Sequence, residues 1–250
     1  MDLSSQVRTA IIAQSLPTPS SDFLTTLTTS RSPPPPLPSL IATARARLLA
    51  CDLCNNSVLD SSTASFPLGV DNVNTAEQKL RRDVHVQVLD IENISLSRWE
   101  QIEELEAIER GEKTKGREII RVAAEEDENG PVNDGSQMQQ HLHQRPTQQS
   151  RPSTAPFAGK NTTHKLVMQD CKGKEILAME LRRVDKIGVG RTMMGEKMVL
   201  KAGTVIARGM FLLSPDTCLV LGGKIDAWHK SWVESRLARL KDAISTNPDT

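Results

Sequence analysis

The chain has 250 residues with equal numbers of acidic and basic side chains, so its formal net charge of +0 points to no class of partner. It contains no run of about 18 or more apolar residues and no basic-then-apolar N-terminus, which excludes a membrane-spanning helix and a secretory signal. Acids are in excess over residues 77–128 and bases over residues 160–250, which favours a polyanion or an acidic protein near the C-terminal part, or attraction between the two parts within the fold.

Three short helices are expected in the N-terminal region, residues 1–70. Their apolar residues recur at helical spacing: Leu3, Val7 and Ile11, then Phe23, Leu24 and Leu27, then Leu40, Ile41, Ala44 and Leu48. The polar run 20–22 is typical of a helix cap, and the proline-rich run 32–38 forbids a helix, so the third helix is expected over residues 39–52. The helices could form a small bundle or a collar packed on a larger unit.

From residue 84 the pattern becomes that of a strand. Residues 84–91 alternate and are rich in Val and Ile. Ser97 and Glu100 have the spacing of a capping box, and they precede a helical apolar stripe formed by Trp99, Ile102, Leu105 and Ile108. Residues 117–124 are a possible short strand.

The C-terminal part is expected to contain four further strands and a helix. The strands are predicted over residues 164–170, 175–181, 197–203 and 205–213, and a short apolar run follows at 218–223. Apolar residues then recur at helical spacing over residues 225–245, which predicts an amphipathic helix.

Residues 125–152 separate the two groups of strands and contain one Val, one Leu and one Met. Such a stretch buries too little apolar surface to offset the entropy of ordering it, so it is expected to be flexible. It could be a linker between two domains or an insertion inside one. The strand at 84–91 has no partner before it, and pairing it with the four later strands gives a five-stranded oligonucleotide/oligosaccharide-binding (OB) barrel.

The predicted fold is therefore α+β. An N-terminal helical bundle precedes an OB domain over residues 80–245, which ends in a helix. A long, partly disordered insertion over residues 109–162 lies between barrel strands one and two, with a low-complexity centre at 125–156. A loop of this length in a compact domain is typically functional.

No catalytic constellation is evident. Cys51 and Cys54 have the C-x-x-C spacing of zinc and redox sites, but no further ligands lie nearby in the sequence, so two packing cysteines are the default. His141 and His143 have no Cys or acid partners at ligand spacing. The Gly-rich run 188–197 fails both phosphate-loop patterns. We expect no enzyme activity, no metal and no cofactor.

Single-strand nucleic-acid binding is one hypothesis for an OB barrel, and the strand bases Lys165, Lys197, Lys201 and Arg208 are candidate phosphate contacts. Such barrels stack bases on aromatic side chains. The predicted strands contain one aromatic residue, Phe211, in a run where burial in the core is favoured. A protein-binding barrel is therefore preferred, and a nucleic-acid-binding module that uses the basic C-terminal third is the alternative.

Several of these segments resemble the RecQ-mediated genome instability protein 1 family. The matching parts are the hairpin around Gln169 and Asp170, the strand pair over residues 197–213, and the ending VLGGKIDAW at 220–228. Residues 86–103 resemble the family's first strand and following helix, and FPLGV at 66–70 with the helices before it resembles the family's helical bundle. Because the chain ends soon after the barrel, it resembles the short fungal form, without a second OB domain.

The resemblance implies a nuclear, non-catalytic scaffold that binds topoisomerase III, a type IA enzyme, and acts with a RecQ-family helicase to dissolve double Holliday junctions. Contact with DNA is expected through the complex. In this family the insertion contacts the topoisomerase gate. We expect the flanks of the insertion to make that contact, through Lys113, Lys115, Arg117, Ile119, Ile120, Phe157 and Lys160.

Overall fold

Three N-terminal helices form where the apolar periodicity predicts them: α1 (Leu3–Ala13), α2 (Ser21–Thr29) and α3 (Leu37–Ala50). The computed structural model describes residues 2–55, 57–114, 117–118 and 162–246 of the chain. The helices pack on one another around a separate apolar cluster that includes Val7, Ile11, Leu24, Leu40 and Leu48. The expected cap is present, because the backbone N–H of Phe23 donates to Ser20 Oγ at 3.1 Å.

The start of α3 differs from the prediction by two residues. Helix α3 begins at Leu37 and includes Pro38 in its first turn. The backbone nitrogen of a residue in the first turn has no intrahelical partner, so a proline is tolerated there. The proline-rich run therefore leads directly into the helix.

Strand β2 (Val84–Asn93) pairs antiparallel with β5 (His164–Asp170) on one side and with β7 (Lys197–Leu200) on the other. β5 also pairs antiparallel with β6 (Glu175–Glu180). This confirms the prediction that the first strand pairs with strands beyond the low-complexity segment.

The predicted strand over residues 205–213 is wrong, since this stretch forms a hairpin of β8 (Val205–Ala207) and β9 (Met210–Leu213). The turn is Arg208-Gly209, where both residues have positive φ, 51° and 75°. Positive φ at both central residues is the geometry of a two-residue hairpin turn, and Arg-Gly is a weaker sequence signal for that turn than Asn-Gly.

Two further strands complete the sheet. The apolar run at 218–223 forms β10 (Cys218–Gly222). Strand β1 (Gln78–Lys79) was not predicted.

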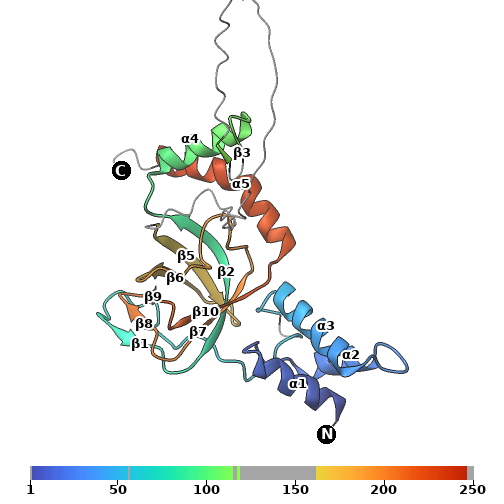
Figure 1. Cartoon of the computed structure of the whole chain (residues 1–250). Helices are drawn as coiled ribbons and strands as arrows, with labels where there is room; N and C mark the ends of the chain where they lie inside the picture. Colours follow the sequence, from blue (N-terminus) through green and yellow to red (C-terminus); the bar gives the residue numbers. More distant parts are fainter. Residues whose placement is uncertain (1, 56, 115–116, 119–161, 247–250) are drawn as a thin grey trace, which may run out of the picture.

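The strand order is β1-β8-β9-β6-β5-β2-β7-β10. β7 and β8 follow one another along the chain, as do β9 and β10, yet each pair is divided between opposite ends of this order. The sheet therefore curls on itself (Figure 1). The pairing between β6 and β9 is parallel, and the other described pairs of this sheet are antiparallel. The inner face is a continuous apolar core that includes Val86, Leu166, Met168, Ala178 and Phe211.

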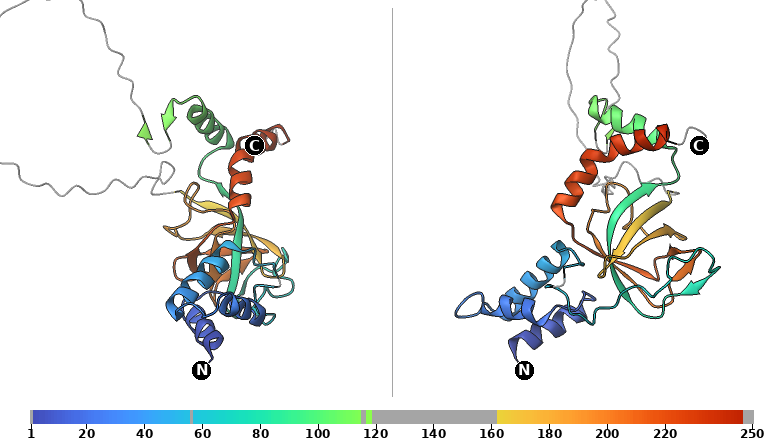
Figure 2. Two further views of the ribbon diagram at one scale, coloured as in Figure 1. Left: turned by 90° about the vertical axis from the view of Figure 1, so that its right-hand side faces the viewer. Right: turned by 180° about the vertical axis from the view of Figure 1, so that it is seen from behind.

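Helices α4 (Arg98–Glu109) and α5 (Asp226–Ser245) pack together at one end of the sheet, and α1 to α3 lie near the other end (Figures 1 and 2). The predicted capping box of α4 is present. Trp99 does not belong to the buried stripe of α4, because 60% of its surface is exposed. None of the helices in the described part of the chain is long and apolar enough to cross a membrane.

A short ladder of β3 (Lys113–Thr114) and β4 (Arg117–Glu118) follows α4. The low-complexity centre at 125–156, His141 and His143 lie outside the described residues, as does most of the possible strand at 117–124.

Candidate partner interface at the base of the insertion

The chain leaves the sheet after β2 and returns to it at β5. The residues just after β2 and those just before β5 are held close together by hydrogen bonds. The backbone N–H of Ile94, just past β2, donates to the carbonyl oxygen of Thr163 at 3.0 Å. The N–H of Thr163 donates to Ser95 Oγ at 2.8 Å. Arg183 Nη1 donates to the carbonyl oxygen of Thr162 at 3.1 Å. We call this group of contacts, together with α4, the insertion base.

A buried carboxylate fixes the first residue of β5. Glu180 Oε2 accepts the backbone N–H of His164 at 2.9 Å and lies 2.7 Å from His164 Nδ1. Its second oxygen accepts the N–H of Val184 at 2.9 Å. His164 and Glu180 are 1% and 5% exposed, so this cluster supports the insertion base from below the surface. Arg183 Nη1, which also donates to Thr162, lies 3.6 Å from Glu180 Oε2, so the cluster connects the start of β5 with the residues that follow β6.

The other side of the insertion base is α4, which α5 holds in place. Gln101 is buried, and its amide donates to the carbonyl oxygens of Asn93 and Leu96 at 2.9 and 3.2 Å. Its own oxygen accepts Arg236 Nη2 at 3.3 Å, and Lys241 Nζ lies 2.7 Å from Glu106 Oε1. These contacts join the end of β2, α4 and α5 into one unit.

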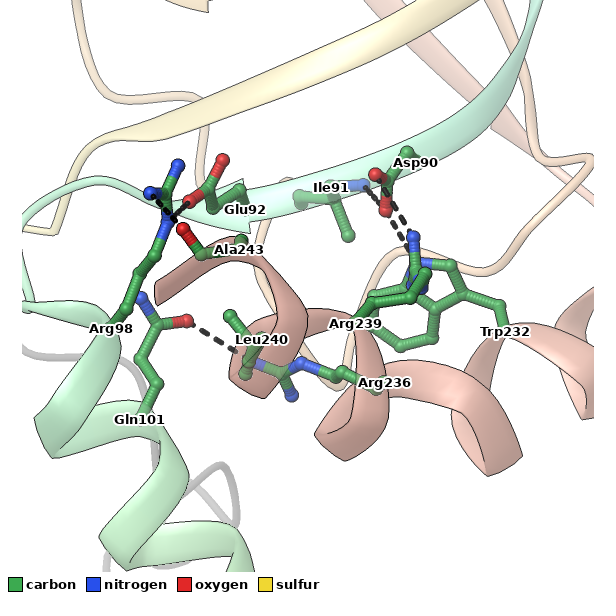
Figure 3. Close-up of a pocket in the computed structure, with 10 residues that line it drawn as sticks. All are labelled: Asp90, Ile91, Glu92, Arg98, Gln101, Trp232, Arg236, Arg239, Leu240 and Ala243. Atoms are coloured by element: carbon green, nitrogen blue, oxygen red, sulfur yellow. Dashed lines mark hydrogen bonds and ion pairs between the residues drawn. The ribbon is translucent and has the colours of Figure 1, made fainter. Parts of the chain in front are cut away.

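A small cavity of about 150 Å³ lies within this unit, between β2, α4 and α5 (Figure 3). Trp232 Nε1 donates to Asp90 Oδ1 at 2.5 Å, and Arg239 Nη1 lies 3.2 Å from the second oxygen of Asp90. The guanidinium groups of Arg236 and Arg239 lie 5.3 and 5.8 Å from the centre of the Trp232 ring. Burial, followed by the charge of Arg239, lowers the pKa of Arg236. The polar groups that line the cavity bond to one another, which is typical of a structural contact.

Most of the predicted contact residues of the insertion lie outside the described residues: Lys115, Ile119, Ile120, Phe157 and Lys160. The backbones of Lys113 and Arg117 belong to β3 and β4, where Lys113 pairs with Glu118. Their roles in binding stay predictions.

The four predicted phosphate contacts have different environments. Lys201 and Arg208 are exposed, and Lys165 Nζ lies 2.5 Å from Glu92 Oε2. Lys197 is 0% exposed, and its Nζ donates to the carbonyl oxygen of Gly195 at 2.6 Å. Burial lowers the pKa of Lys197 to about 8, and the neighbouring Cys51 and Asp52 oppose this shift. Lys197 faces the interior, so its assignment as a phosphate contact is wrong.

The C-x-x-C segment lies where the N-terminal helices meet the sheet. Gln87, a fully buried residue of β2, accepts the backbone N–H of Leu53 at 3.0 Å and donates to Asp52 Oδ1 at 2.6 Å. Burial raises the pKa of Cys51, and burial and then Asp52 raise the pKa of Cys54 to about 11. Raised pKa values keep these thiols protonated and poorly reactive. Among the described residues, no three His, Cys, Asp or Glu side chains are placed to hold a metal ion.

Sequence reasoning missed Gln87, Glu180 and Gln101, which are buried polar residues with several partners each. A polar residue inside an apolar alternating run, as Gln87 is between Val86 and Val88, is the one signal that could have marked such a position.

A curled sheet that contains one parallel strand pair, with a helical region before it, is typical of an OB-fold protein of two-part architecture. Residues 66–236 match the family model described as "RMI1, N-terminal OB-fold domain", and residues 12–55 match "RMI1, N-terminal helical domain". The chain belongs to the RMI1 family, and the resemblance found in the sequence is confirmed. It is 25% identical over 170 residues to "RecQ-mediated genome instability protein 1" of Schizosaccharomyces pombe, a match that covers 67% of each chain.

Proposed function

We propose that this chain is a non-catalytic scaffold subunit of a nuclear complex that contains a RecQ-family helicase and topoisomerase III, and that it contacts DNA through that complex. The observation that carries the proposal is the family match, which extends over both the helical region and the OB fold. The relative from Schizosaccharomyces pombe is named for a RecQ-mediated role in genome stability.

The insertion base supports a role in binding the topoisomerase. The two ends of the chain segment between Thr114 and Thr162 arise from α4 and from the start of β5, which the buried Gln101 and Glu180 hold in place. A chain segment whose two ends are fixed presents its contacts with a smaller loss of entropy on binding. We infer that residues 109–162 form an insertion of the OB domain that contacts the gate of the topoisomerase and modulates its opening, which promotes decatenation and dissolution of double Holliday junctions.

A deletion of residues 125–160 tests this inference. The variant keeps the described part of the insertion base, so it should still co-purify with topoisomerase III. Its stimulation of decatenation should fall by at least about tenfold, because the segment that reaches the gate is missing. The measurement is a pull-down of purified proteins, followed by a decatenation time course at saturating scaffold.

A variant with residues 125–160 replaced by a Gly/Ser chain of the same length is the matched control, since it preserves the length of the segment and removes its sequence. Stimulation at the wild-type level by both variants would rule out the gate role. Failure of the wild-type chain to capture the topoisomerase would rule out the scaffold function itself.

A further inference from the structure

The outer face of four neighbouring strands is apolar. In β5, β6, β8 and β9 the side chains alternate between buried and partly or fully exposed positions, as expected for a sheet with one face in the core. On the outward positions of these strands, and on the residue that follows β6, lie eight apolar side chains, which we call the barrel-side patch: Val167, Leu177, Met179, Leu181, Val205, Ala207, Met210 and Leu212.

The strand register makes this patch continuous. Leu177 of β6 pairs with Val167 of β5 on one side and with Met210 of β9 on the other. One step further along, Met179 pairs with Leu212, and Leu212 pairs with Val205 of β8. Directly paired side chains on one face are in contact range, so the patch spans all four strands without a polar interruption.

Polar residues surround the barrel-side patch. At one edge, Lys165 pairs with Met179 and forms an ion pair with Glu92. Gln169 pairs with Glu175 at the far end of β5. Lys79 of β1 pairs with Val205 at the opposite edge, is exposed, and makes no ion pair within the described part of the chain. An apolar centre with a polar rim is the usual anatomy of a protein interface.

Two leucines of the patch are exposed, and its other six side chains are partly exposed among the described residues. Leu177 is 42% exposed and Leu181 is 61% exposed. Strands β6, β8 and β9, which carry most of the patch, lie below α4 and α5 in Figure 1. None of the patch residues belongs to those two helices.

The strand pairing and the composition of the patch exclude two kinds of binding partner, an added β-strand and a stacked nucleic-acid strand. β5, β6, β8 and β9 each pair with a strand on both sides, so a partner cannot add a strand to them. No aromatic side chain lies on the patch, so it offers no platform for stacked bases. A partner must therefore dock through apolar side chains of its own.

The dimensions favour a helix. Three strand spacings of about 4.8 Å give a width of about 14 Å, and the outward side chains from Leu177 to Leu181 cover about 13 Å. The area of the patch, about 14 Å by about 13 Å, is far below the roughly 800 Å² that each partner buries in a stable protein dimer. It matches two to three turns of a helix, which is about 10 Å in diameter and rises about 5.4 Å per turn. The thioether side chains of Met179 and Met210 can adapt to the ridge of such a helix.

We propose that the barrel-side patch is the docking site for an amphipathic helix of the RecQ-family helicase, with aliphatic residues at i, i+3, i+4 and i+7 and an acidic residue facing Lys79. This inference rests on the proposed function, in which the topoisomerase uses the insertion base and the barrel-side patch is left for the helicase.

The test uses the full chain, purified helicase and purified topoisomerase III. The double variant Leu177→Asp/Leu181→Asp places charges on outward positions of the patch. Val73→Asp/Val233→Asp is the matched control, because these valines are 62% and 43% exposed and lie outside the patch. Thermal unfolding should show that both variants fold. The patch variant should bind the helicase at least about tenfold more weakly and bind the topoisomerase normally, and the control should bind both normally.

A photo-crosslinker placed at position 177 is the second measurement, and it does not depend on a destabilising charge. The crosslinked peptide should come from a helicase segment with helical aliphatic spacing. Equal helicase binding by the patch and control variants, or a crosslink to an extended segment, would overturn the proposal. Loss of topoisomerase binding, or of self-association seen by sedimentation, would assign the patch to those occupants instead and overturn it as well. A wild-type chain that binds neither enzyme would overturn the proposed function and this inference with it.

Discussion

Glu196 and Lys197 are adjacent in the chain, and burial disfavours the charged form of both. Burial raises the pKa of Glu196 from 4.5 to about 7, against the backbone N–H of Met193 and the charge of Lys186. Burial also lowers the pKa of Lys197 from 10.5 to about 8. Glu196 is 8% exposed, and Lys197 is fully enclosed. Glu196, just before β7, and Lys197, its first residue, therefore make the stability of the fold depend on pH.

The direction of the Glu196 effect follows from its raised pKa. Between pH 4.5 and about 7 the folded chain retains a proton that the unfolded chain has released. The contribution of Glu196 to stability is therefore complete below the unfolded pKa and is lost as the pH rises through about 7. At about 1.4 kcal/mol per pKa unit, the loss is on the order of 3 kcal/mol.

Glu196→Gln should remove this dependence, because the amide does not titrate. The free energy of unfolding, measured with urea at several pH values from 5 to 8, should fall less steeply for Glu196→Gln than for the wild type. Glu175→Gln, at an exposed position of β6, is the control and should follow the wild-type profile. Parallel profiles for Glu196→Gln and the wild type would show that burial of this carboxyl does not set the pH dependence.

At the scale of elements, the turn of the β8–β9 hairpin places a residue with a Cβ in a backbone conformation that favours glycine or asparagine. Arg208 has a φ of 51°, which costs a residue with a Cβ about 1 kcal/mol or more, whereas Asn adopts this conformation more readily. Arg208→Asn should therefore raise the free energy of unfolding by about 0.5 kcal/mol.

Gly209→Ala should lower the free energy of unfolding by more than about 2 kcal/mol, because the new Cβ would lie 2.6 Å from the carbonyl oxygen of Asp71. Chemical denaturation measures both, and destabilisation by Arg208→Asn would argue against strain at this turn.

The elements that the sequence predicts well are those in which local pattern and tertiary environment agree. Strand β2 and the capped helix α4 are examples, since alternation and the Ser97–Glu100 box specify them directly. The hairpin at 205–213 was missed because its turn has no strong local signal. The barrel-side patch was not predicted because β6 is apolar on both faces, and alternation cannot reveal which side faces solvent.

At the scale of the whole molecule, the junction between the N-terminal helices and the sheet depends on contacts that are remote in sequence. Gln87 connects Asp52 with Gln169, to which its amide donates at 2.9 Å. Gly223, which directly follows β10, meets α3, and a Cβ there would lie 2.4 Å from the carbonyl oxygen of Leu49. Single-sequence patterns contain no information on such pairs. The resemblance did mark the VLGG segment, and the close approach at Gly223 supplies a physical reason for a glycine there.

Gly222 and Gly223 form a matched pair that isolates this junction. Their φ angles are 90° and 89°, so alanine is strained equally at both, but a Cβ at Gly222 meets nothing within 4 Å among the described atoms. Gly222→Ala should lower the free energy of unfolding by about 1–2 kcal/mol from backbone strain alone. Gly223→Ala should cost at least about 2 kcal/mol more, since α3 must move off the sheet, and should increase proteolytic cleavage within residues 2–55. Urea denaturation and limited proteolysis of the two variants measure the difference. Equal losses of stability would show that the contact between Gly223 and Leu49 does not hold the helical region against the sheet.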